Sequence, residues 1–91
     1  MTRYEWDPWK AASNFAKHGV HFADAVGVFE DDHAITIEDP STNEERFKTL
    51  GMDFLGRVLV VVYAHGEETI RLITARKANA PQRAVYERKR R

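Results

Sequence analysis

The sequence predicts a small α+β protein, in which an antiparallel sheet packs with two N-terminal helices and one C-terminal helix. Helical signals come first: an Asp-Pro pair at residues 7–8 is followed by apolar residues at helical spacing up to residue 29. From residue 33 to residue 77 the pattern changes to strand-like alternation, interrupted by short turns. Another Pro, at residue 81, then opens a final helix. Consecutive strands joined by short turns favour an antiparallel meander.

The first elements are a short strand and a capped helix. Tyr4-Glu5-Trp6 is an aromatic run that we expect to form the first strand. Asp7 is a good N-cap, Pro8 suits the first helical position, and Gly19 is the residue type expected just after the C-terminus. The apolar stripe predicted for this helix consists of Ala12, Phe15 and Ala16.

A second helix is predicted directly after Gly19. Its core-facing residues recur at positions i, i+3, i+4 and i+7, and they are Phe22, Ala25, Val26 and Phe29. His21 stands at the cap, where Ser or Thr would be better. The acidic residues 30–32 oppose the helix dipole, so we expect the helix to end there.

Four strands are predicted next, at residues 33–39, 44–54, 57–63 and 69–77, with a loop at 39–44 and a hairpin turn at 65–68. The third of these is almost entirely β-branched, which is typical of a central strand that is buried on both faces. Along it, Val58, Val60 and Val62 share one face, which we expect to pack against the helices. Arg57, Tyr63 and His65 would then lie on the other face.

Length and composition limit the classes of protein. A chain of 91 residues is long enough for one domain, residues 1–91. It has no cysteine, which excludes disulfides, thiolate metal sites and a cysteine nucleophile. The longest apolar run, residues 58–64, is too short to span a membrane, and the N-terminus has no apolar signal region. We therefore expect a cytoplasmic protein.

Charge is divided unevenly along a chain whose net charge is zero. Residues 1–45 carry three basic and ten acidic residues, a net of −7, whereas residues 46–91 carry eleven basic and four acidic residues, a net of +7. A basic half of this kind is typical of a phosphate-binding surface. We interpret residues 88–91 as a solvated tail and the arginines inside predicted elements as the candidates for binding.

The C-terminal segment contains the best candidates for RNA contacts. Arg76 ends the last strand, and Arg83 and Tyr86 lie three residues apart on one face of the final helix. Because the connection at 77–80 is short, the three side chains are predicted to converge. Arginine binds phosphate through two hydrogen bonds, and tyrosine stacks on bases or transfers protons. Packing is an equal alternative for Tyr86 and for Tyr63.

Several long segments together resemble one family. Residues 5–29, EWDPWKAASNFAKHGVHFADAVGVF, then EER, GRVLVVVY, RLITARKA and R-x-x-Y-E, are similar to the BrnT family of bacterial type II toxins. The resemblance covers nearly the whole chain. It implies a RelE-like fold, a ribonuclease that stops translation, and a BrnA-like antitoxin with a ribbon-helix-helix DNA-binding domain, bound in a heterotetramer. The chain departs from the family at Gln82, where Glu is usual, and at His21, where Ser or Thr is common.

The basic half and the resemblance together predict RNA cleavage without a metal or another cofactor. Such chemistry needs a base, an acid and cations that stabilise the phosphorane. The predicted catalytic residues are Arg76, Tyr86, His18 and Lys10, and the predicted RNA-binding residues are Arg57, Arg83 and Tyr63.

Alternatives remain at the level of residues and of function. His18 could cap its helix, Lys10 could be a surface lysine, and Asn14 could either orient His18 or bond a neighbouring loop. His18 and His21 form H-x-x-H, but Gly19 breaks the helix between them, so no metal site is predicted. The rival function is a non-catalytic module that binds RNA or protein. A DNA-binding repressor is disfavoured because no helix-turn-helix spacing is present.

Overall fold

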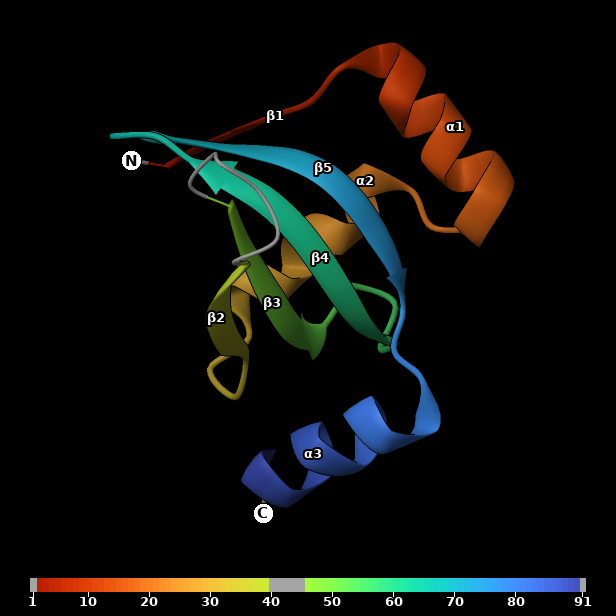
Figure 1. The fold of residues 1–91 in the computed structure, drawn as a ribbon, viewed down its shortest axis with the longest axis vertical. Coiled ribbons are helices and arrows are strands. Elements are labelled where there is room, and N and C mark those ends of the chain that lie inside the picture. The colour runs from red at the N-terminus through yellow and green to blue at the C-terminus, as the bar shows by residue number, and fades with distance from the viewer. Residues whose placement is uncertain (1, 40–45, 91) are drawn as a thin grey trace.

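The computed structural model describes residues 2–39 and 46–90 (Figure 1). The elements in chain order are β1 (Arg3–Glu5), α1 (Pro8–His18), α2 (Phe22–Ala25), the 3-10 helix η1 (Val26–Glu30), β2 (Ile35–Asp39), β3 (Arg46–Met52), β4 (Val58–His65), β5 (Thr69–Lys77) and α3 (Ala80–Arg90). The predicted loop at residues 39–44 lies almost wholly outside the described residues.

The sheet is mixed, with the strand order β1-β5-β4-β3-β2. Strands β2 to β5 form the predicted antiparallel meander, but β1 joins β5 in parallel, with Arg3 opposite Thr69 and Glu5 opposite Arg71. The prediction of a purely antiparallel sheet is therefore wrong at this edge. Because β1 is only three residues long, it leaves the later part of β5 without a strand neighbour on that side.

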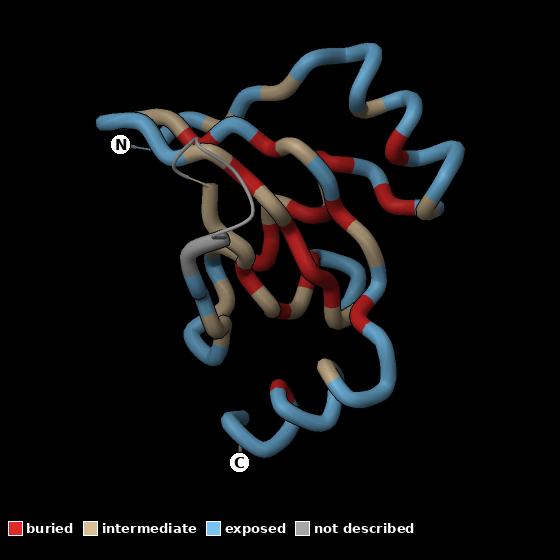
Figure 2. Tube along the Cα trace, viewed as in Figure 1, coloured by how far each residue is buried: buried red, intermediate tan, exposed pale blue. Residues whose placement is uncertain are grey.

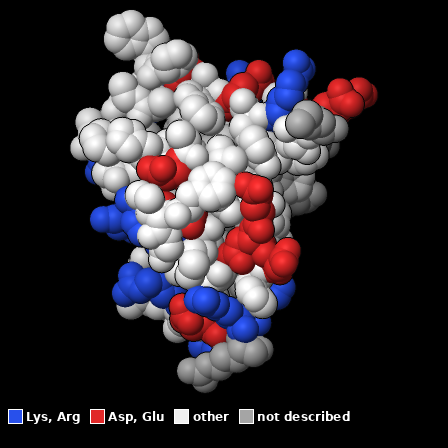
Figure 3. Space-filling model, turned by 180° about the vertical axis from the view of Figure 1, so that it is seen from behind, with Lys and Arg blue, Asp and Glu red and all other residues white. Residues whose placement is uncertain are grey.

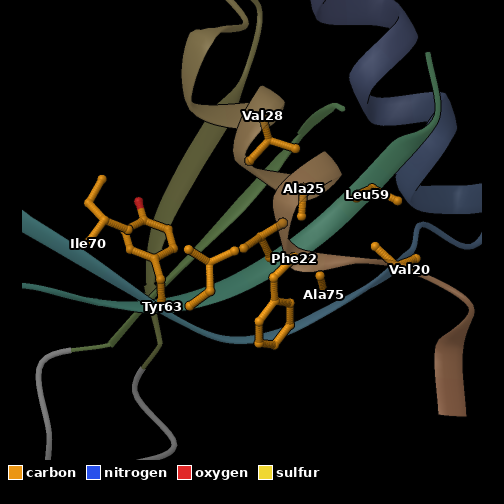
Figure 4. Close-up of a cluster of buried hydrophobic side chains, with 10 residues drawn as sticks. Val20, Phe22, Ala25, Val28, Leu59, Tyr63, Ile70 and Ala75 are labelled. Carbon is orange, nitrogen blue, oxygen red and sulfur yellow. The ribbon is translucent and has the colours of Figure 1, made fainter. Parts of the chain in front are cut away.

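One face of the sheet carries the hydrophobic core. Figure 1 shows α2 and η1 behind the sheet and α1 beside its β5 edge, whereas the near face is open and α3 lies at its lower end. Buried segments in Figure 2 follow β4, β5 and the helices behind them. Figure 4 shows Phe22, Ala25 and Val28 from α2 and η1 beside Leu59 and Tyr63 of the sheet.

The face of β4 that packs against these helices is the one opposite to the prediction. Leu59 and Val61 are 0% exposed and Tyr63 is 5% exposed, and all three belong to the core cluster. Val58 and Val62 are only half-buried, on the open face. The two sets are almost equally apolar, so alternation alone did not identify the inner set. Val60, also on the open face, is buried, so the predicted burial on both faces of this strand holds at Val60 but not at Val58 or Val62.

Helix α1 begins and ends at the predicted caps. The Asp7 carboxylate accepts a hydrogen bond from the Trp9 N–H at 2.8 Å, and Gly19 adopts a φ of 70°. The predicted apolar stripe is wrong, since Ala12 and Ala16 are exposed and Phe15 is 44% exposed. The helix instead turns its polar side, with Asn14 at the centre, toward the sheet.

The predicted second helix is divided into two short pieces, α2 and the 3-10 helix η1. The tighter η1 lies against the turn between β3 and β4 at Gly27, where an added Cβ would be 2.5 Å from the Phe54 nitrogen. His21 makes no side-chain cap bond, and its ring stacks on Phe15 with centroids 3.9 Å apart. The segment ends at Glu30, within the acidic run that predicted its end.

Candidate functional site

A groove separates α1 from the part of β5 that lacks a strand neighbour. Its volume is about 270 Å³, and we call it the α1–β5 groove. The lining residues are Lys10, Ser13, Asn14, Lys17 and His18 from α1 and Ile73 and Thr74 from β5. The α1 residues recur at intervals of three and four, so they form one stripe of the helix. The groove therefore brings together Lys10 and His18, two of the predicted catalytic residues.

Asn14 fixes the distance between the two walls of this groove. Its amide nitrogen donates to the carbonyl oxygens of Ala75 at 2.9 Å and Val20 at 3.0 Å, and its Oδ1 accepts from the Ala75 N–H at 3.0 Å. The carboxamide thus pairs with β5 as a neighbouring strand would. Both amide hydrogens are used, so Asn14 cannot also donate to His18, and the loop-binding alternative holds for this residue.

The lining of the α1–β5 groove is positively charged. Lys10 and Lys17 contribute to it, and none of its lining residues is acidic. Positive side chains that surround a concave surface raise the local concentration of anions. The negative charge of an RNA phosphate is complementary to this lining.

Arg76 lies just beyond the groove on β5. It alternates with Thr74 on the open face, where Thr74 is opposite Val62 and Arg76 is opposite Val60. Its Nη1 donates to the Gln82 Oε1 at 3.2 Å and to the Lys77 carbonyl at 3.3 Å. Among the described residues its Nε and Nη2 have no protein partner, so these donors can reach a bound anion.

Gln82 connects Arg76 to the first turn of α3. The Gln82 Oε1 accepts from the Asn79 N–H at 3.0 Å, and the Asn79 Oδ1 accepts from the Gln82 N–H at 2.9 Å, which is a capping box. The same Gln82 oxygen therefore caps the N-terminus of α3 and orients the Arg76 guanidinium. A neutral amide performs both tasks here.

The predicted convergence of Arg76, Arg83 and Tyr86 is not what the structure shows. Arg83 Nη1 donates to the Ala78 carbonyl at 2.8 Å, close to the start of α3. Tyr86 is 1% exposed, and its hydroxyl donates to the Asp31 Oδ2 at 2.6 Å. The three side chains thus bind three different places, and Tyr86 attaches α3 to the end of η1.

The environment of Tyr86 keeps its hydroxyl group protonated. Burial, the hydrogen bond to Asp31 and the negative charge of Asp31 together raise the pKa of Tyr86 to about 12. Burial would raise the pKa of Asp31 too, but hydrogen bonds from Tyr86, Met52 and His33 outweigh it and leave that pKa below its ordinary value. At neutral pH the pair is therefore a neutral phenol and a carboxylate, which suits a structural link.

Arg57 and Tyr63 also have structural partners. The Arg57 guanidinium binds the Asp53 carboxylate through Nε at 3.0 Å and Nη2 at 2.8 Å, and Nη1 lies 3.3 Å from the Gly19 carbonyl. Tyr63 lies in the core, where its hydroxyl accepts from the Thr49 Oγ1 at 2.9 Å. Its buried ring offers no exposed face to a base, so the structure gives Tyr63 the packing role.

Two basic residues near the site were missed by the sequence reasoning. Lys17 lines the α1–β5 groove seven residues after Lys10, a spacing that could have identified it. Lys48 is opposite Val62 on the open face. No signal identified Lys48, because alternation along β3 did not say which set of side chains faces outward.

Surface charge follows the division seen along the chain. In Figure 3, which shows the helix-covered side, basic side chains gather at the bottom over α3, and acidic side chains form a band above them. Within residues 2–39 and 46–90, no three His, Asp or Glu side chains gather as metal ligands. No helix of that part is long and apolar enough to cross a membrane.

Comparisons with known proteins agree on one family. The family model described as "Ribonuclease toxin, BrnT, of type II toxin-antitoxin system" matches residues 6–81. The crystal structure of the Brucella abortus ribonuclease toxin BrnT is similar, with a TM-score of 0.69, 26% identity, and coverage of 87% of this chain and 99% of that one. No curated protein matches. The α+β fold and the predicted resemblance are thereby confirmed, and the chain belongs to the BrnT family of ribonuclease toxins of type II toxin-antitoxin systems.

Proposed function

We propose that the chain is an endoribonuclease that cleaves RNA at the α1–β5 groove without a metal ion and thereby inhibits translation. The observation that carries this proposal is the gathering of Lys10, Lys17 and His18 in one groove without an acidic lining residue, with Arg76 two positions beyond Thr74 on β5. We infer the reaction class from the family and the position of the catalytic site from the groove.

The proposed reaction is an internal transesterification of RNA. The ribose 2′-oxygen bonds to the adjacent phosphorus while the bond from phosphorus to the 5′-oxygen breaks. One proton leaves the 2′-hydroxyl and one is added to the 5′-oxygen, and His18 is the group placed to transfer them. Lys10 and Arg76 stabilise the extra negative charge of the phosphorane. The products carry a 2′,3′-cyclic phosphate and a 5′-hydroxyl.

The other predicted site residues take supporting roles in this proposal. Tyr86 and Arg57 hold α3 and the turn between β3 and β4 in place through Asp31 and Asp53. Arg83 adds positive charge near the end of β5, and Tyr63 packs in the core. The neutral, buried hydroxyl of Tyr86 makes it a poor proton acceptor at neutral pH.

The partner is proposed on the basis of the family. A type II toxin has an antitoxin, and we expect a BrnA-like protein with a ribbon-helix-helix domain, encoded beside this chain and bound in a heterotetramer in the cytoplasm. The net charge of +7 on residues 46–91 favours an acidic partner surface. A RelE-like fold, which the resemblance to the family implies, is part of the same proposal.

Product analysis tests the reaction. Purified chain is incubated with labelled single-stranded RNA in excess EDTA, and the ends of the fragments are identified. Cleavage that leaves 2′,3′-cyclic phosphates and continues in EDTA supports the proposal. If EDTA abolishes cleavage and Mg²⁺ or Zn²⁺ restores it, the mechanism is wrong. Intact RNA that stays bound to the chain would favour the non-catalytic binding module.

A further inference from the structure

A second groove lies on the open face of the sheet, between its far edge and α3. Its volume is about 290 Å³, and we call it the β2–α3 groove. The lining residues are Ile35 and Ile37 from β2, Lys48 and Leu50 from β3, Val60 from β4, and Gln82 and Val85 from α3. Five of them are aliphatic, and none is acidic. The ribonuclease chemistry proposed above makes no use of this groove.

The groove exposes apolar side chains that the fold does not cover. Ile37 is 58% exposed and Val85 is 41% exposed, and they line the same groove from β2 and α3. Helix α3 is held at its start by the capping box and farther along by the Tyr86 hydroxyl on Asp31. These anchors position α3 without closing the space in front of β2. Aliphatic surface of this kind gains free energy when a partner removes it from water.

The charges around the groove indicate what can fill it. Lys48 is part of its wall, and Arg88, Lys89 and Arg90 form the last turn of the same helix. A phosphate-rich ligand would satisfy the cations but not the aliphatic floor. The groove, at about 290 Å³, lies at the lower end of the range for ligand pockets, and it has room for a few side chains. The matching occupant is a peptide segment with aliphatic side chains flanked by Asp or Glu.

We infer that the β2–α3 groove is where the antitoxin inserts an apolar segment flanked by acidic residues. The inference rests on the proposed function only for the existence of the partner. Gln82 lines the groove and also accepts the hydrogen bond from Arg76. An inserted segment therefore lies against the residue that orients Arg76, and its acidic flank competes with RNA phosphate for the guanidinium. Inhibition thus acts on Arg76 from the side opposite to the α1–β5 groove.

Charge substitutions in the groove test this inference. The probe is the small protein encoded by the adjacent gene, and its affinity is measured for Ile37→Glu, Val85→Glu and the matched control Leu55→Glu. Leu55 is 63% exposed and lies in the turn between β3 and β4. We expect the groove variants to weaken binding at least about tenfold, because each places a carboxylate in a desolvated contact, and the control to bind normally. RNA cleavage by all three free variants should stay unchanged.

Single-cysteine labelling gives an independent readout, because the chain has no native cysteine. Val85→Cys should react with a maleimide in the free chain and be protected in the complex, whereas Leu55→Cys should react equally in both. Equal reaction of Val85→Cys in both states would overturn the inference. Normal partner binding by folded groove variants would also overturn it, and so would a loss of RNA cleavage in those variants. Self-association of the free chain that Ile37→Glu abolishes would overturn it as well, because the groove would then bind a second copy. If the wild-type chain binds the partner through the groove but leaves RNA intact, the ribonuclease proposal fails and this inference stands.

Discussion

Tyr86→Phe separates a structural role from a catalytic role for the one tyrosine in the predicted catalytic set. The substitution removes only the hydroxyl that donates to the Asp31 Oδ2 at 2.6 Å. Asp31 keeps its hydrogen bonds from the N–H groups of Met52 and His33. The carboxylate therefore stays partly satisfied, and the fold should survive with α3 less firmly attached.

The expected loss of stability follows from the charge on Asp31. A hydrogen bond to a charged group contributes about 1.5–3 kcal/mol to the free energy of unfolding. For a domain of this size, a loss of about 2 kcal/mol lowers Tm by roughly 8–16 °C. Tyr63→Phe is the matched control, because its hydroxyl pairs with the neutral Thr49, which keeps a second partner in Thr36. That variant should lose about 0.5–1.5 kcal/mol.

The penalty for Tyr86→Phe should depend on pH. The pKa of Asp31 is lowered in the folded state, so the contribution of its ionised form is present above the ordinary carboxyl pKa, about 3.9. It is lost as the pH falls through the lower, folded value. The stabilities of wild type and Tyr86→Phe in urea should therefore differ fully at pH 7 and progressively less as the pH falls below about 3.9.

The assay pairs urea unfolding with RNA cleavage at a temperature where both proteins are folded. We expect Tyr86→Phe to be less stable than wild type and to cleave at the wild-type rate per folded molecule. A variant of wild-type stability that has lost cleavage would contradict the structural role and identify Tyr86 as a catalytic residue.

Three further substitutions or treatments have defined outcomes. Asn14→Leu should lower the free energy of unfolding in urea by about 3 kcal/mol or more, because it leaves both backbone groups of Ala75 without the side chain that pairs with them. Wild-type stability of this variant would contradict the pairing of Asn14 with the edge of β5. Gly27→Ala should lower Tm markedly, because its Cβ would lie 2.5 Å from the Phe54 nitrogen, whereas Gly66→Ala, with no atom nearer than 3.5 Å, serves as the control. Excess chelator should leave the rate of RNA cleavage unchanged, and a rate that falls in EDTA and recovers with Zn²⁺ would show that a metal takes part.

Much of the fold could be predicted because local signals were strong. The Asp7 cap, the αL Gly19 and the alternating pattern of β3 to β5 each depend on neighbouring residues alone. The parallel pairing of β1 with β5 depends instead on residues more than sixty positions apart. Nothing in a three-residue strand specifies its partner, so the mixed sheet was not predicted.

The face of each element was harder to predict than the element itself. On β4 both sets of side chains are apolar, and α3 covers Val60 while the other helices cover Leu59 and Val61. On α1 the buried residue is Asn14, whose burial is stable only because its polar atoms pair with Val20 and Ala75. A hydrophobic pattern cannot indicate a helix that packs through a polar side chain.

The sequence predicted which residue types lie at the candidate site better than it predicted how their side chains are arranged. Lys10 and His18 do share a groove, and Arg76 lies next to it on β5. Tyr86 was grouped with Arg76 because of a short connection, but its position is decided by Asp31 on a distant segment. Arginines and tyrosines are equally suited to RNA and to structural hydrogen bonds, so the sequence alone left their roles open.

The most direct test of the account compares the groove with the basic tail. Purified His18→Gln, Arg76→Ala and a chain truncated before Arg88 are assayed side by side on one single-stranded RNA, with circular dichroism as the control for folding. We expect both substitutions to keep the fold and to lower cleavage by about 10²-fold or more, the usual effect of losing one proton-transfer or charge-stabilising group. Truncation should cost only modest, salt-dependent affinity. If truncation abolishes cleavage while folded His18→Gln and Arg76→Ala remain active, the site lies elsewhere and the central claim is wrong.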